Sequence, residues 1–285
     1  MSLKIGFLIQ QMKNDPSASI ILETMNILRG KKVKIDIVNP DEYLMDLSFL
    51  EVACDLYILR PWPVELSLSL GSILHHKGAK ILNSFPASSE VKDKIRVTSR
   101  LFERGIPTPQ SFVTGSLGLI TAREEYPFIL KPHRGSCSEG ITILRANEPL
   151  SAELDGTFIL QEFLNSDGED LKIYVIGNEV YGLKRSPQAK TYQEKAGRPY
   201  PLNENLKQIA LDCGEIFDLH IYGIDIIETD QGPFVVDINA FPGFIGVPDA
   251  SEKLADYIYR YATTGPEIFP LVLQTGLNPQ TVFRA

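Results

Sequence analysis

Three side chains with oxygen donors lie close together in one predicted hairpin. Asp237 and Asn239 are two residues apart between Val235 and Gly243, so on a strand their side chains leave the same face. Asp225 lies inside an apolar run on the preceding strand. Carboxylate and amide oxygens are hard ligands that suit magnesium, whose other positions take water and phosphate oxygens. These carboxylates could instead face solvent on an edge hairpin. Charges inside apolar strands are uncommon without a partner, so the pattern favours a metal site.

A second segment combines a lysine with a loop rich in serine and glycine. Lys131 ends an apolar strand, and the loop at 135–140 follows it. A lysine in this place can bind phosphate oxygens, and glycine lets backbone N–H groups approach a phosphate closely. Taken alone, however, this pattern is more often a surface hairpin.

The apolar strand predicted at 158–164 could border a nucleotide base. A purine ring needs an apolar slot and one or two hydrogen bonds at its edge, which the backbone of such a segment can supply. A buried strand with Glu162 at its exposed end explains the same residues equally well.

Two basic residues lie on successive strands of another predicted hairpin. Lys172 and Arg185 flank the tight turn at Gly177-Asn178. Alternation places Lys172, Tyr174 and Ile176 on one face and the intervening residues on the other. Isolated basic residues on strands are usually solvated, so neither residue indicates a site by itself.

The elements that must position these residues begin with alternating strands and helices. The apolar runs predict strands at 4–9, 33–38, 56–59 and 80–82 and helices at 19–28 and 66–76. This alternation predicts a parallel sheet covered on both faces. No glycine-rich dinucleotide fingerprint follows the first strand, so this part is not a standard nicotinamide-binding unit.

The remaining elements are mostly strands. An amphipathic helix at 91–104 ends where glycine and two prolines follow at 105–109. Further strands are predicted at 127–132, 141–144, 158–163, 170–176, 179–184, 221–228 and 233–238, and helices at 205–217 and 251–261. The proline-containing stretch 186–201 is predicted to be a mobile loop over the site.

Composition limits the class of protein. The formal net charge is −8, which argues against nucleic acid or an anionic membrane as the main partner. Three widely spaced cysteines form neither a disulfide framework nor a zinc cluster. The start of the sequence resembles a strand rather than a signal peptide, and no apolar run approaches the length of a membrane span. We therefore expect a cytoplasmic protein.

Taken in order, these segments resemble the ATP-grasp superfamily over about residues 83–261. The matching segments are Asp93-Lys94, Gly105–Pro109, Leu130-Lys131-Pro132 with the loop to Gly140, Gln161-Glu162-Phe163, Asp170-Leu171-Lys172, Arg185, Gly223-Ile224-Asp225 and Asp237-Ile238-Asn239 with Pro242-Gly243. Each segment alone is a weak signal, whereas their order is a strong one.

Two groups within the superfamily are similar to this chain. The run from Asp237 to Gly243 and Lys172 resemble inositol trisphosphate kinases, whereas ligases usually have Glu and Arg at positions 237 and 172. The Lys131 segment with its serine loop, and the compact length, resemble the ribosomal-protein-type (RimK-like) glutamate ligases. The resemblance implies ATP with two magnesium ions, for which manganese could substitute.

The resemblance also implies roles for individual residues. Lys94, Lys131, Ser136, Ser138 and Gly140 would hold or cover the ATP phosphates. Gln161, Glu162, Phe163 and Leu164 would border adenine, and Asp170 would contact the ribose. Asp225, Asp237 and Asn239 would bind magnesium. Arg185 would face the transferred phosphoryl group, and Lys172 would hold an anionic part of the acceptor.

The fold that the resemblance implies has an N-terminal parallel α/β lobe followed by two α+β lobes that sandwich ATP. We expect domains at 1–84, 85–162 and 163–265, and a tail at 266–285 to which we assign no role. The first functional hypothesis is a carboxylate–amine ligase that acts through an acyl phosphate on a small molecule or peptide. Related ligases often assemble, which leaves a homo-oligomer open.

Two alternatives stay open at this level. A kinase of a polyol phosphate would need a basic pocket, for which the candidates are His133, Arg134, Lys184, Arg185, Lys190 and Lys195. A non-catalytic nucleotide-binding protein is the third hypothesis. It is the least favoured because the candidate metal ligands and both phosphate lysines are present.

Overall fold

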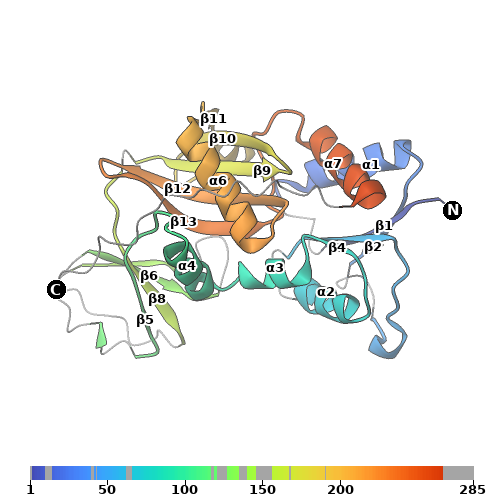
Figure 1. Cartoon of the computed structure of the whole chain (residues 1–285), viewed down its shortest axis with the longest axis horizontal. Coiled ribbons are helices and arrows are strands. Elements are labelled where there is room, and N and C mark those ends of the chain that lie inside the picture. The colour runs from blue at the N-terminus through green and yellow to red at the C-terminus, as the bar shows by residue number, and fades with distance from the viewer. Residues whose placement is uncertain are drawn as a thin grey trace.

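The computed structural model describes residues 2–9, 15–39, 42, 44–61, 66–116, 119–120, 127–134, 140–145, 156–166, 168–189 and 191–265. Within these ranges the strands form three separate sheets (Figure 1). None of the helices in these ranges has both the length and the hydrophobicity that a membrane-spanning helix requires.

The first sheet is parallel and has the strand order β2-β1-β3-β4. Its strands are β1 (Lys4–Leu8), β2 (Lys34–Val38), β3 (Leu56–Leu59) and β4 (Ile81–Leu82). Two helices, α1 (Ala18–Gly30) and α2 (Leu66–His76), and the short 3-10 helix η2 (Leu47–Phe49) lie between them. The parallel sheet predicted from the alternating pattern is confirmed.

The second sheet is antiparallel and has the order β5-β8-β6-β7. It consists of β5 (Ser111–Thr114), β6 (Phe128–Pro132), β7 (Thr142–Leu144) and β8 (Phe158–Glu162). The helix predicted at 91–104 is present as α4 (Lys94–Glu103), and a further short helix that was not predicted, α3 (Phe85–Glu90), precedes it. The helices are separate because the Asp93 side chain accepts hydrogen bonds from the N–H groups of Ile95 and Arg96, which starts a new helix.

The third sheet is antiparallel and has the order β11-β10-β9-β12-β13. Its strands are β9 (Asp170–Ile176), β10 (Glu179–Arg185), β11 (Arg198–Pro199), β12 (Ile221–Thr229) and β13 (Gly232–Ala240). The helices of this region are α5 (Tyr192–Ala196), α6 (Glu204–Phe217) and α7 (Ala250–Thr264). Figure 1 shows α6 lying along this sheet and α7 beside α1.

The two faces of β9 belong to different cores, as alternation predicts. Ile173 and Val175 face a core that includes residues of α6, and we call this the back face. Tyr174 and Ile176 face a core that includes residues of α1 and α7, and we call this the front face. The front-face core therefore joins the first lobe to the third sheet.

A buried asparagine fixes the junction between the first lobe and the third sheet. The Asn83 side chain is fully buried. Its amide donates to the carbonyl of Ile221, and its oxygen accepts from the N–H groups of His220 and Ile221. These three hydrogen bonds join the Asn83 side chain to the backbone at the start of β12.

The stretch predicted as a mobile loop at 186–201 contains regular structure in its described residues. Thr191 and Glu194 form a reciprocal capping box that starts α5. The two residues of β11 then pair with β10. These local hydrogen bonds explain why the proline-based prediction missed both elements.

Candidate active site

The charged residues predicted for the site share the front face of the third sheet. The register pairs Asp170 with Arg185 and Lys172 with Asp225. Directly paired residues of an antiparallel sheet point to the same side. Lys172 is two residues from Tyr174, which belongs to the front-face core. This face is therefore apolar beneath α1 and α7 and charged at its other end.

The predicted metal ligands meet on β12 and β13. Asp225 lies directly opposite Asp237, and Gly223 lies opposite Asn239. The Asn239 amide donates to Oδ2 of Asp237 over 3.2 Å. Two carboxylates directly opposite each other on adjacent strands repel and call for a cation. This donor set of two carboxylates and one amide oxygen fits magnesium. In the described ranges, no group of three His, Cys, Asp or Glu residues is arranged to hold a metal.

Lys172 places a positive charge beside Asp225. Nζ of Lys172 lies 2.5 Å from Oδ1 of Asp225, and the lysine side chain is only 10% exposed. Burial alone lowers the pKa of Lys172, but the neighbouring Asp225 outweighs it, and the pKa lies above its ordinary value. Lys172 therefore stays protonated.

A bulge in β13 lies where a side chain of the second sheet contacts this strand. The register of β12 and β13 shifts after Asp225, so that Ile226 pairs with Val235 and Val236 is the extra residue. Nζ of Lys131, which comes from β6, donates to the Val236 carbonyl over 3.5 Å. Lys131 thus reaches from the second sheet to the residue that precedes Asp237.

The environment of Lys131 suits an anion. Its side chain is buried, and burial lowers its pKa; Lys94 lowers it further, while Asp237 and Asp225 act in the opposite direction. Lys94 begins α4, and its backbone N–H donates to the carbonyl of His133 just beyond β6. A phosphate group beside Lys131 would favour its charged form.

Asp170 and Arg185 form the far end of the charged face. Burial raises the pKa of Asp170, and so does Asp225, whereas Arg185 and Lys172 lower it. Nη1 of Arg185 donates to the carbonyl of Lys195 at 3.4 Å. The chain returns closely beside it, because a Cβ on Gly197 would lie 2.4 Å from the Lys184 carbonyl oxygen. The α5 segment is thereby held against Arg185.

The residues predicted to border adenine lie at the end of β8. The buried Gln161 side chain donates to Oγ of Ser111, which gives it a packing role. The backbone N–H groups of Glu162 and Phe163 donate to the carbonyls of Gln110 and Pro127. Hydrogen bonds from these two residues to a purine edge would therefore have to use carbonyls or side chains. Glu162 is exposed, and Phe163 and Leu164 are partly buried.

The serine–glycine loop lies mostly outside the described residues, including the predicted phosphate ligands Ser136 and Ser138. Its last residue, Gly140, has φ 71°. A Cβ at this position would lie 2.8 Å from Cγ of Pro132. Glycine is required here both by the backbone conformation and by the close approach to the end of β6.

The comparison with family models decides among the sequence hypotheses. Residues 91–258 match the model of the RimK-like ATP-grasp domain, which is more than half of the chain. The chain belongs to the RimK-like ATP-grasp family. This match covers the second and third sheets and therefore all of the predicted site residues.

Curated relatives of this RimK-like protein are named as ligases. The glutamate–LysW ligase ArgX of Sulfolobus acidocaldarius is 26% identical over 252 residues, covering 80% of this chain and 89% of the relative. A probable alpha-L-glutamate ligase of Haemophilus influenzae is 28% identical over 213 residues, covering 66% and 71%. A RimK-domain ATP-grasp protein from Sphaerobacter thermophilus has a TM-score of 0.69 at 16% identity, covering 90% and 99%.

These findings confirm the ATP-grasp fold and the ATP-dependent carboxylate–amine ligase activity. The arrangement of the basic residues also argues against the kinase alternative. Nζ of Lys184 lies 3.0 Å from Glu228, on the back face of the sheet, whereas Arg185 lies on the front face. The basic residues proposed for a polyol phosphate pocket therefore do not all converge. Lys190 lies outside the described residues.

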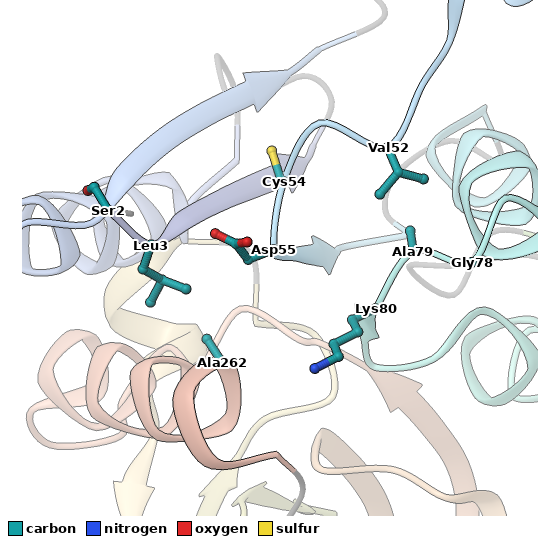
Figure 2. A pocket seen from close by; sticks show the side chains of 9 residues that line it. All are labelled: Ser2, Leu3, Val52, Cys54, Asp55, Gly78, Ala79, Lys80 and Ala262. Atoms are coloured by element: carbon teal, nitrogen blue, oxygen red, sulfur yellow. The ribbon is translucent and has the colours of Figure 1, made fainter.

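A pocket of about 510 Å³ lies away from these residues, at the amino end of the parallel sheet. Figure 2 shows Lys80, Asp55 and Cys54 around it, and Ala262 of α7 on the facing side. None of the predicted site residues lines it.

Sequence reasoning missed the role of the Val236 carbonyl. Val235 and Ile238 are both buried in the back-face core. Their spacing of three residues breaks strict alternation, and a bulge accounts for this spacing. That odd spacing is the signal from which the bulge could have been predicted.

Proposed function

We propose that this RimK-like ligase uses magnesium-bound ATP to join the amino group of glutamate to a carboxylate on a peptide or small protein. The observation that carries the proposal is the cationic set formed by Lys131, Lys172 and Arg185 around the opposed pair Asp225 and Asp237. The named substrates of the curated relatives support glutamate as one reactant.

The first step transfers the γ-phosphoryl group. An acceptor carboxylate oxygen attacks the γ-phosphorus, the bond to the bridging oxygen breaks, and ADP leaves. Lys131 and Lys94 hold phosphate oxygens, and Arg185 stabilises the charge on the transferred group. Asp225, Asp237 and Asn239 would hold magnesium, which would supply positive charge to offset that of the phosphate oxygens. A pair of ions sharing Asp237 would match this donor set.

The second step forms the amide. The amine attacks the acyl carbon of the acyl phosphate, inorganic phosphate leaves, and the nitrogen loses a proton. Lys172 and Arg185 lie on the same face of the sheet, where they can hold the leaving phosphate. The expected location of this chemistry is the cytoplasm.

A phosphate-fate assay tests the proposal. The protein is incubated with γ-labelled ATP, magnesium, glutamate and a mixture of peptides with free carboxyl termini. Free labelled phosphate that requires both glutamate and peptide, together with a peptide heavier by one glutamyl residue, is the expected result. Label that stays on an organic acceptor without an amine requirement would overturn the proposal in favour of a kinase.

Arg185 provides a direct test of the assigned roles. Arg185→Ala is expected to reduce turnover about 10²–10³-fold, the usual loss when one stabilising donor is removed. ATP should still raise the melting temperature at saturating magnesium. Turnover close to that of the wild type would remove Arg185 from the mechanism.

A further inference from the structure

A buried charged cluster lies at the carboxyl edge of the first sheet. In this sheet β2 lies on one side of β1, and β3, the next strand along the chain, lies on the other side of β1. The gap between β1 and β3 is therefore the topological switch point, where open α/β sheets bind ligands. Arg60 directly follows β3, and its backbone N–H donates to the carbonyl of Leu8 at the end of β1.

Three polar side chains in this gap contact one another directly. Nη2 of Arg60 lies 2.6 Å from Oδ2 of Asp15 and donates to Oγ of Ser17 at 2.9 Å. Oγ of Ser17 donates in turn to Oδ1 of Asp15 at 2.7 Å. The Arg60 and Asp15 side chains are only 3% and 4% exposed. We call Asp15, Ser17 and Arg60 the switch-point cluster.

A buried ion pair is weak evidence for stability. Desolvation of both ions opposes their attraction, and well-packed apolar residues often stabilise a protein equally well. We therefore expect the Asp15–Arg60 pair to act by fixing the positions of the segments that it joins rather than by stabilising the fold.

The switch-point cluster contacts the loop that follows β13. A Cβ on Gly243 would lie 2.7 Å from Cβ of Ser17, so the Gly243 backbone lies close against the Ser17 side chain. Gly243 is four residues beyond Asn239. The neighbouring Phe241 and Phe244 are buried in the front-face core.

We propose that Asp15, Ser17 and Arg60 are positioning residues that hold the switch point of the first lobe against the loop after β13, so that an acceptor carboxylate bound there faces the γ-phosphate. This inference rests on the proposed ligase function. The cluster acts through the contact between Ser17 and Gly243, and none of its members is among the residues that we assign to ATP. Its loss therefore changes use of the acceptor and leaves ATP binding intact.

Kinetics and melting of four variants test this role. Arg60→Met removes the positive charge, and Arg60→Lys keeps this charge but loses the planar guanidinium group with its several donors. The double variant Asp15→Leu with Arg60→Met removes both charges of the ion pair. Arg100→Met is the matched control, because Nη1 of Arg100 donates to both carboxylate oxygens of Glu90 and neither residue belongs to the switch-point cluster. The substrates are glutamate and the peptide mixture, and binding of magnesium-ATP is read from the shift in melting temperature.

The expected result is a loss in the use of the acceptor peptide without a loss in ATP binding. Arg60→Met lowers kcat/KM for the peptide about 10²-fold, as a misplacement of about 1 Å can do. The ATP-induced melting shift stays at the wild-type value. The doubly apolar variant melts like the wild type but stays impaired, and Arg60→Lys regains part of the activity. Wild-type kcat/KM in the doubly apolar variant, or an equal loss of ATP binding, overturns the proposal.

A second measurement does not depend on the ligase reaction. Arg60→Met and Gly243→Ala are combined, and the decreases in melting temperature are compared. If Arg60 acts through Ser17 on Gly243, the combined decrease is smaller than the sum of the two, whereas additive decreases overturn the link. Failure of the wild-type protein to ligate glutamate would count against the proposed function, while this comparison would still decide the positional link.

Discussion

Nζ of Lys172 and Oδ1 of Asp225 lie 2.5 Å apart on neighbouring strands of the third sheet. Asp225 is at the same time directly opposite Asp237 on its other side. The lysine therefore offsets part of the repulsion between two carboxylates that we assign to magnesium. The metal and Lys172 should stabilise the same local charge.

Lys172→Met is expected to make stability depend on magnesium. Removing one partner of a buried ion pair costs about 3 kcal/mol, because the other charge is left uncompensated. Magnesium binding to the two carboxylates should recover much of this loss. Chemical denaturation with EDTA and with saturating magnesium measures both effects.

The control for this experiment is Lys207→Met, whose partner Glu204 is largely exposed. Such surface pairs contribute at most about 1 kcal/mol. If magnesium stabilised the Lys172 variant no more than the wild type, Asp225 and Asp237 would not share a metal.

Lys131→Met is expected to raise stability and remove ATP protection. Burial lowers the pKa of Lys131, so the folded state binds this proton less tightly than the unfolded state. Below the folded-state pKa the charged lysine therefore opposes folding, and this opposition disappears as the pH rises towards the ordinary lysine value. A gain of about 1 kcal/mol at pH 7 would raise Tm by about 2–4 °C.

Melting curves at pH 7 and pH 10, with and without magnesium-ATP, check this expectation. The gain in Tm should shrink at the higher pH, and the ATP-induced shift should be small at both. A variant that is less stable than the wild type and still protected by ATP would contradict the assignment of Lys131 to phosphate.

Most strands of the third sheet could be predicted, because their signals are local. Gly177-Asn178 marks one hairpin, residues 229–232 mark another, and alternation correctly assigns the two faces of β9. The order of the candidate residues along the chain could also be predicted, because each follows or lies within a readable strand.

The contacts between segments that are distant in the sequence could not be predicted from local patterns. Lys131 reaches Val236 across 105 residues of sequence, and Arg60 reaches Ser17 across 43. A basic residue at the end of a strand has the same local pattern whether it faces solvent or a distant carbonyl. Only the tertiary packing of segments that are distant in the sequence decides between these outcomes.

Asn83→Ala is expected to loosen the junction between the first lobe and the third sheet. The buried side chain makes three hydrogen bonds to the backbone of His220 and Ile221. Leaving these backbone groups unsatisfied should cost about 2–3 kcal/mol. That loss corresponds to a decrease in Tm of about 5–10 °C.

The matched control is Asn203→Ala, which removes the side-chain cap of α6. A lost cap costs about 1 kcal/mol, so this variant should melt clearly above the Asn83 variant. Equal melting temperatures for the two variants would show that the Asn83 bonds do not hold the lobes together.

Asp237→Asn is expected to separate catalysis from nucleotide binding. The substitution keeps the shape of the side chain but removes one of the two opposed carboxylates, so repulsion with Asp225 falls while magnesium is held more weakly. We expect turnover to fall about 10²–10³-fold, with the protein at least as stable without metal as the wild type. Asp230→Asn, in the exposed turn between β12 and β13, should leave both properties unchanged. Turnover measured over a range of magnesium concentrations decides the matter, because a metal ligand shifts the half-saturating concentration upward. A decrease in turnover that is independent of magnesium would instead assign Asp237 to the acceptor.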